Sequence, residues 1–120
     1  MAAAQGVCGA VAGPIEPMTR DALSWRITIP VDGSLPDGGL APTLIQWDSQ
    51  PHPASKLPDL GCALQGLEIL HPRPERMRAL LAALAFDGPV DVRAVPAGGT
   101  PCLRAHIQTP RGPRMLPAAA

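Results

Sequence analysis

Proline and glycine limit the length of every regular segment in this chain. The 120 residues include 16 prolines and 12 glycines, spread over most of the sequence. Proline lacks the amide hydrogen that a helix or an inner strand needs, so long regular segments are excluded over most of the chain. The length is enough for one hydrophobic core. With no Tyr, one Phe and two Trp, that core has to be built mainly from Leu, Ile, Val and Ala.

The clearest pattern is a strand–helix–strand unit between Leu64 and Val95. Residues 63–70 are rich in apolar side chains and favour a strand. Residues 74–86 place apolar side chains at the i, i+3, i+4, i+7 spacing of a helix with one buried face: Met77, Leu80, Leu81 and Leu84. Pro74 suits the first turn of that helix.

The end of the helix is marked by residues 87–89 (DGP). We expect Gly88 to be the left-handed cap, after which residues 90–95 return as a strand. The connections on both sides of the helix are short, which predicts a right-handed β-α-β unit.

Alternation of apolar and polar residues predicts the other strands. Residues 23–31 and 102–109 alternate clearly, and residues 43–47 and 114–116 form shorter segments. The fold class predicted is therefore α+β, with a mixed β-sheet and one main helix.

The domain limits follow from these segments. Residues 1–20 show no sustained period and are expected to be a flexible N-terminal arm. Residues 21–116 are expected to form a single domain, followed by a tail at 117–120.

One helix covers only one face of a sheet, so the opposite face should carry the polar strand residues. Whether Glu68 also lies on this face depends on the register of its strand, because a shift of one residue moves a side chain to the other face. The residues expected on the polar face are Arg26, Gln46, Arg104, His106 and Gln108.

Charge and cysteine content narrow the partners. The formal net charge is zero and no run of one sign occurs, which argues against nucleic acid or a membrane as a partner. No apolar run approaches the roughly 20 residues of a membrane span. The odd set of three cysteines, Cys8, Cys62 and Cys102, shows no metal or disulfide spacing and favours the cytoplasm.

Several short stretches, in this order, resemble the glyoxalase-like domain of the vicinal oxygen chelate superfamily. They are residues 42–48 (PTLIQWD), the pair His52-Pro53, residues 67–72 (LEILHP) and residues 108–112 (QTPRG).

The resemblance implies a fold of paired βαβββ modules around a cleft. Residues 64–116 look like one such module, and residues 21–47 look like the last two strands of a second, incomplete module. The chain is thus similar to the C-terminal portion of a longer member, and a homodimer is expected to complete the cleft. Members include metal-dependent lyases, isomerases and dioxygenases, and metal-free proteins that sequester drugs.

The metal ligands that the resemblance implies are missing. No His lies near the start of the strand at 63–70, and Gln46, Arg104 and Gln108 stand where a carboxylate is wanted. His52, His71 and His106 have no ligand spacing, whereas a metal site needs about three converging ligands. We therefore expect no metal ion and no cofactor on a single chain.

Arg26 and Arg104 are interpreted in two ways. If they share one sheet face, they bind a carboxylate or phosphate through paired hydrogen bonds, or they form a solvated or dimer-facing surface. His106 is the best candidate for a general acid or base. Because the sequence shows no Ser, Cys or Asp partner for it, whether the chain catalyses a reaction stays open.

The remaining ligand-binding candidates also have structural interpretations. His52 either hydrogen-bonds a ligand at the lip of a cleft or packs on Trp47. Trp47 either stacks on a ligand or acts as an anchor of the core or of the rim. Glu68 either acts as a base or ligand or pairs with a neighbouring Arg.

Three hypotheses follow for function. The first is a metal-free small-molecule-binding or vestigial glyoxalase-like domain that acts as a homodimer. The second is a metal-dependent enzyme of the same superfamily, with a site completed across the dimer. The third is a protein-interaction module whose partner binds the polar sheet face.

Overall fold

The computed structural model describes residues 4, 6 and 11–117. Most of the first ten residues of the expected arm, including Cys8, and residues 118–120 of the expected tail lie outside the described residues. The chain divides into two compact units, Met1–Pro58 and Asp59–Ala120. The expected domain limits, 21–116, stay a prediction.

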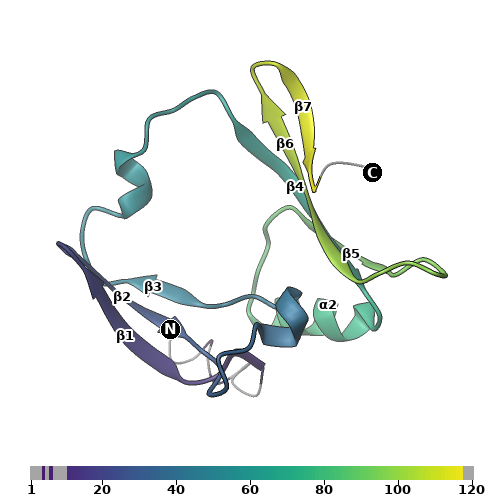
Figure 1. Cartoon of the computed structure of the whole chain (residues 1–120), viewed down its shortest axis with the longest axis horizontal. Helices are drawn as coiled ribbons and strands as arrows, with labels where there is room; N and C mark the ends of the chain where they lie inside the picture. Colours follow the sequence, from purple (N-terminus) through teal and green to yellow (C-terminus); the bar gives the residue numbers. More distant parts are fainter. Residues whose placement is uncertain (1–3, 5, 7–10, 118–120) are drawn as a thin grey trace. The chain divides into compact units, whose positions relative to one another are not determined.

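The first unit contains an antiparallel sheet with the strand order β1-β2-β3 (Figure 1). Its strands are β1 (Ile15–Arg20), β2 (Leu23–Thr28) and β3 (Ile45–Trp47). Two short 3₁₀ helices, η1 (Pro36–Gly39) and η2 (Pro53–Lys56), lie in the connections. The predicted strands at 23–31 and 43–47 are confirmed, although both are shorter than expected.

Strand β1 was not predicted, because its side chains show no alternation of burial. It contains Pro17, which pairs with Arg26 of β2. The strand order gives β1 one neighbour, so Pro17 sits on an edge strand, where a missing amide hydrogen is tolerated.

The second unit contains the predicted β-α-β unit and the strands that follow it. Its elements are β4 (Ala63–His71), α2 (Pro74–Ala83), β5 (Val90–Ala94), β6 (Cys102–Thr109) and β7 (Gly112–Leu116). The strand order is β5-β4-β6-β7. Strand β4 pairs with β5 in parallel and with β6 antiparallel, and β6 pairs antiparallel with β7. The predicted α+β class with a mixed sheet and one main helix is confirmed.

Helix α2 packs on strands β4 and β5. Met77 of the helix is 2% exposed, and Ile69 and Val92 of the two strands are 4% and 6% exposed. The guanidinium of Arg78 donates a hydrogen bond to the backbone carbonyl of Val92, which ties the helix to β5. The apolar face of this sheet therefore lies against the helix, as predicted.

The end of α2 differs from the prediction. The helix stops at Ala83, and the residue with left-handed backbone is Ala85, with φ of 52°, rather than Gly88. The amide of Ala85 donates to the Ala82 carbonyl and that of Phe86 to the Leu81 carbonyl, at 2.9 and 3.0 Å, which is a Schellman ending.

Gly88 has a different role from the one predicted. A Cβ atom at this position would overlap the ring of Phe86. Gly88 therefore allows the Phe86 ring to lie close to the backbone that leads into β5.

Among the described residues, no helix is long and apolar enough to cross a membrane.

The left-handed alanine leads to a stability prediction. Ala85→Gly should raise the free energy of unfolding by about 0.5–1 kcal/mol, because glycine adopts φ > 0 without the Cβ penalty. Ala79→Gly, at an exposed position inside the same helix, should lower it by about 1 kcal/mol. Urea unfolding followed by far-UV circular dichroism measures both. A loss of stability in Ala85→Gly would contradict the assigned helix ending.

Candidate functional site

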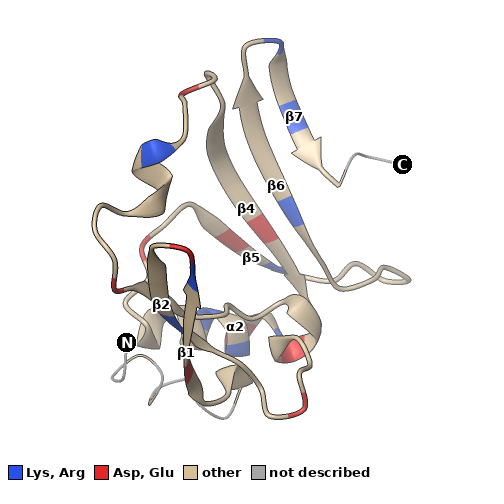
Figure 2. Ribbon diagram, turned by 60° about the vertical axis from the view of Figure 1, so that its left-hand side comes forward, with Lys and Arg blue, Asp and Glu red and all other residues tan. Residues whose placement is uncertain are grey.

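The register of β4 with β6 brings three of the predicted site residues together. Glu68 lies opposite Arg104, and Gly66 lies opposite His106. Side chains two residues apart on a strand point to the same face, so Glu68, Arg104 and His106 share one face of the sheet. Figure 2 shows the acidic bands of β4 and β5 beside the basic band of β6. The open question of register is thus answered in favour of Glu68 on the polar face.

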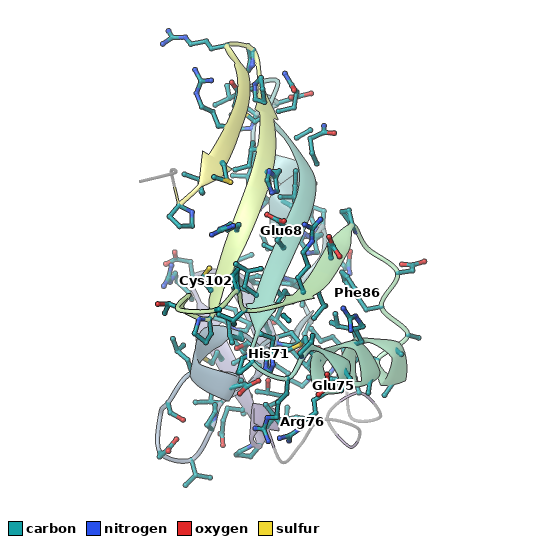
Figure 3. All side chains as sticks on the ribbon, turned by 90° about the vertical axis from the view of Figure 1, so that its right-hand side faces the viewer. Glu68, His71, Glu75, Arg76, Phe86 and Cys102 are labelled. Carbon is teal, nitrogen blue, oxygen red and sulfur yellow. The ribbon has the colours of Figure 1, made fainter. Side chains whose placement is uncertain are left out.

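Glu68 and His106 form a direct hydrogen bond. The distance between His106 Nε2 and Glu68 Oε2 is 2.8 Å. An ionised carboxylate only accepts hydrogen bonds, so Nε2 of His106 is the donor in this contact. The side chain of Glu68 is 19% exposed and that of His106 is 44% exposed. Figure 3 shows Glu68 on the sheet, apart from helix α2 with Glu75 and Arg76.

Two residues of β5 that the sequence analysis missed complete the charge cluster. Asp91 lies opposite Glu68 on β5, and like charges in such a pair destabilise a sheet. Arg93 offsets this repulsion, because its Nε is 2.6 Å from Asp91 Oδ2 and its Nη1 is 3.8 Å from Glu68 Oε1. The alternation of residues 90–93 (VDVR) was the signal that could have placed both residues on the polar face.

The hydrogen bond from His106 holds the pKa of the Glu68 carboxyl below its ordinary value. Partial burial of the carboxyl acts in the opposite direction, and the positive charges of Arg93 and Arg104 add to the lowering. The carboxylate at the centre of this face is therefore ionised at neutral pH, and it accepts hydrogen bonds rather than donating them.

An open hollow of about 530 Å³ lies beside this cluster. Glu68, Asp91, Arg93 and His106 contribute its polar and charged lining, and the chain around Gly66 and residues 88–90 forms the rest. The hollow thus combines polar groups with apolar and backbone surface, within one unit of the chain.

The donor set does not fit a metal ion. Within the described part of the chain, no group of three His, Cys, Asp or Glu residues is placed to hold one. Glu68 and His106 converge as two possible ligands, but the next charged groups beside Glu68 include the guanidinium groups of Arg93 and Arg104. A cation placed there would meet these two positive charges, and the remaining carboxylate, Asp91, is already paired with Arg93.

The other predicted site residues belong to the first unit. Arg26 and Gln46 are cross-strand partners on one face of the β1-β2-β3 sheet. The Arg26 guanidinium is held by Asp48, with Nη2 and Oδ1 2.8 Å apart, and this contact raises the pKa of Arg26. Arg26 therefore forms an ion pair with a residue of its own unit.

Trp47 and His52 lie in an aromatic group on the first unit. The ring centroids of Trp25 and Trp47 are 5.1 Å apart, and those of Trp47 and His52 are 5.9 Å apart. The Nδ1 atom of His52 accepts a hydrogen bond from the Ala54 amide and caps η2. These contacts match the structural interpretation of both residues, in which His52 packs on Trp47.

One expectation about these residues is wrong. Arg26 and Arg104 do not share a face of one sheet, because β2 and β6 belong to different sheets. Alternation shows which side of a strand a residue occupies, but it carries no information on which strands are hydrogen-bonded to each other.

Comparison with known families gives a match over more than half of the chain. The model of a family described as glyoxalase-like domain matches residues 1–85, which include the first unit, β4 and α2. No curated protein and no solved structure matches the chain.

The Glu68–His106 hydrogen bond leads to a pH prediction. In His106→Ala, the pKa of Glu68 should rise toward the ordinary carboxyl value of 4.5, because its main stabilising donor is gone. A lowered carboxyl pKa stabilises the fold above that ordinary value, and the contribution is lost as the pH falls through the folded value. The variant should therefore lose less stability on acidification.

Titration of the Glu68 carboxyl carbon by NMR measures this pKa. His52→Ala is the control, because that imidazole is bonded within the other unit. An unchanged titration of Glu68 in His106→Ala would contradict the assigned cause.

Proposed function

The chain belongs to the glyoxalase-like domain family, and we propose that it binds a small organic molecule on the polar face of the β5-β4-β6-β7 sheet. The observation that carries this proposal is the hollow of about 530 Å³ beside Glu68 and His106. Sites for small molecules usually have volumes of about 300–1,000 Å³ and combine apolar walls with a few placed polar groups.

The lining provides both kinds of contact. Glu68 and His106 offer a carboxylate and an imidazole whose positions are fixed by their mutual hydrogen bond. Leu67, Pro89 and Val90 supply apolar surface close to them. Polar groups that are already held in place need little ordering when a ligand binds, which favours affinity.

The proposed binding needs no metal ion. Glu68 is engaged by His106 and Arg93, so its charge is balanced by groups of the chain itself. Family members that use a metal need a third ligand, and the described residues do not place one beside this pair.

We also propose that the chain acts as a homodimer. The strand order leaves β5 and β7 with one sheet neighbour each. Leu64 of β4 and Leu116 of β7 are 55% and 56% exposed, and their cross-strand partners are Ile107 and Ala105. A second copy that covers this apolar part of the sheet would remove it from water.

The cytoplasm is the proposed location. Among the described cysteines, Cys62 and Cys102 are both free, and free thiols are typical of a reducing compartment.

Ligand binding is tested with a fragment library and ¹H–¹⁵N NMR spectra of the full chain. We expect fragments that shift the amide signals of Gly66 and Gly88, equally before and after treatment with EDTA. Gly66→Leu should abolish these shifts by filling the hollow, since a Cβ at Gly66 lies in ordinary contact, 3.6 Å, with the Pro89 carbonyl oxygen.

Gln108→Leu is the matched control, because Gln108 is exposed on the same sheet face and does not line the hollow. A library that yields no fragment at these amides would overturn the binding proposal. Shifts that vanish with EDTA would overturn its metal-free part.

The dimer is tested by light scattering after size-exclusion chromatography. We expect a mass of twice the 12.5 kDa of one chain. Leu116→Glu should shift the equilibrium toward monomer at least about tenfold, because it places a charge on the apolar surface. Gln108→Glu should leave the mass unchanged. A monomer at every protein concentration would contradict the proposed homodimer.

A further inference from the structure

We infer that the ligand is a carboxylate, and that Arg104 holds its charge beside the hollow. The inference rests on the proposed function and adds the chemical class of the ligand. It starts from the hydrogen-bonding state of Arg104 and from its place on β6, next to the His106 that lines the hollow.

The guanidinium of Arg104 has N–H groups that donate no hydrogen bond to the described residues. Among the described residues, no acceptor lies within hydrogen-bonding distance of its side chain, although the residue is only partly exposed. Three arginines of the same unit do bind an acceptor: Arg78 binds the Val92 carbonyl, Arg93 binds Asp91, and Arg114 binds the Pro113 carbonyl. Among the described residues the side chains of Arg73, Arg76 and Arg111 bind none either, but these three residues are exposed, unlike Arg104. Half-burial deprives Arg104 of part of its hydration, and the charge of Glu68 attracts it without a hydrogen bond in return.

Glu68 does not fill this need, although it lies directly opposite Arg104 on β4. Its Oε2 atom is taken by His106, and its Oε1 atom is the one nearest to Arg93. Each oxygen of the carboxylate therefore has another partner nearby. A planar guanidinium with free N–H groups matches the two oxygens of a carboxylate.

The position of Arg104 lets a ligand reach it from the hollow. Arg104 and His106 are two residues apart on the same face of β6, so their side chains start roughly 7 Å apart. His106 lines the hollow. A molecule with a ring in the hollow and a carboxylate beside the ring therefore spans from the apolar wall to Arg104.

The charges around the hollow disfavour a ligand with two negative charges more than one with a single negative charge. Glu68 and Asp91 are both carboxylates and repel a dianion such as a phosphate monoester. A cationic ligand finds no free carboxylate either, because Asp91 is bound by Arg93 and Glu68 by His106. Within the described residues, Arg104 is the charged group of this cluster whose N–H groups have no hydrogen-bond acceptor.

Benzoate and benzamide are the probes, since they share a ring and differ in charge. Titrations of the full chain are followed through the amide signals of Gly66 and Ala105. Benzoate should bind at least about tenfold more tightly than benzamide, and its affinity should fall as salt rises from low to physiological concentration.

Variants of Arg104 test the contact itself. Arg104→Gln should weaken benzoate at least about tenfold and leave benzamide unchanged. Arg104→Lys should recover part of the loss, because it restores the charge without the paired donors. Arg114→Gln is the matched control: Arg114 lies opposite Ile107, which places it on the other face of the sheet, and its loss should not change either affinity.

The outcomes separate this inference from the proposed function. Equal binding of benzoate and benzamide at Gly66 would overturn the carboxylate inference and leave small-molecule binding in place. Binding of neither probe would overturn the inference as well, and the fragment screen then decides the proposed function by itself. If Arg104→Gln fails to fold, the comparison of the two probes on the unmodified chain still decides.

Discussion

The antiparallel pairing of β4 with β6 is the constraint on which the candidate site depends. It sets Glu68 opposite Arg104 and brings His106 to within 2.8 Å of the Glu68 carboxylate. A shift of one residue would move Glu68 to the face that packs on α2, where an ionised carboxylate would be buried among apolar side chains. The burial of Ile69 and Val92 under the helix thus fixes the register, and the register in turn assembles the charge cluster.

Much of the fold could be predicted because burial imposes periodicity. Residues 102–109 alternate clearly, and the predicted strand matches β6 residue for residue. Strand β1 escaped prediction because it is an exposed edge strand, so its sequence carries no alternation. The end of α2 was predicted wrongly. Ala85 adopts a left-handed backbone conformation that glycine usually takes, so the sequence pointed to the nearby Gly88 as the cap.

Three residues of the candidate site were predicted individually, but the contacts between them were not. The sequence indicated Glu68, Arg104 and His106 as polar strand residues, and it could not show that Glu68 is the hydrogen-bond partner of His106, since residues 68 and 106 meet only through strand pairing. The same limit led to the wrong association of Arg26 with Arg104. Membership of the glyoxalase-like family fits the resemblance found in short stretches of sequence, and the structure adds that Glu68 contacts His106 and Arg93.

The placement of the aromatic residues has a practical consequence for work on this protein. Both tryptophans, Trp25 and Trp47, belong to the unit that ends at Pro58, and the sequence contains no tyrosine. Intrinsic fluorescence therefore reports on that unit alone, whereas far-UV circular dichroism reports on both. Agreement or disagreement between the two signals during denaturation reveals whether the units unfold in one cooperative step, with no label and no substitution.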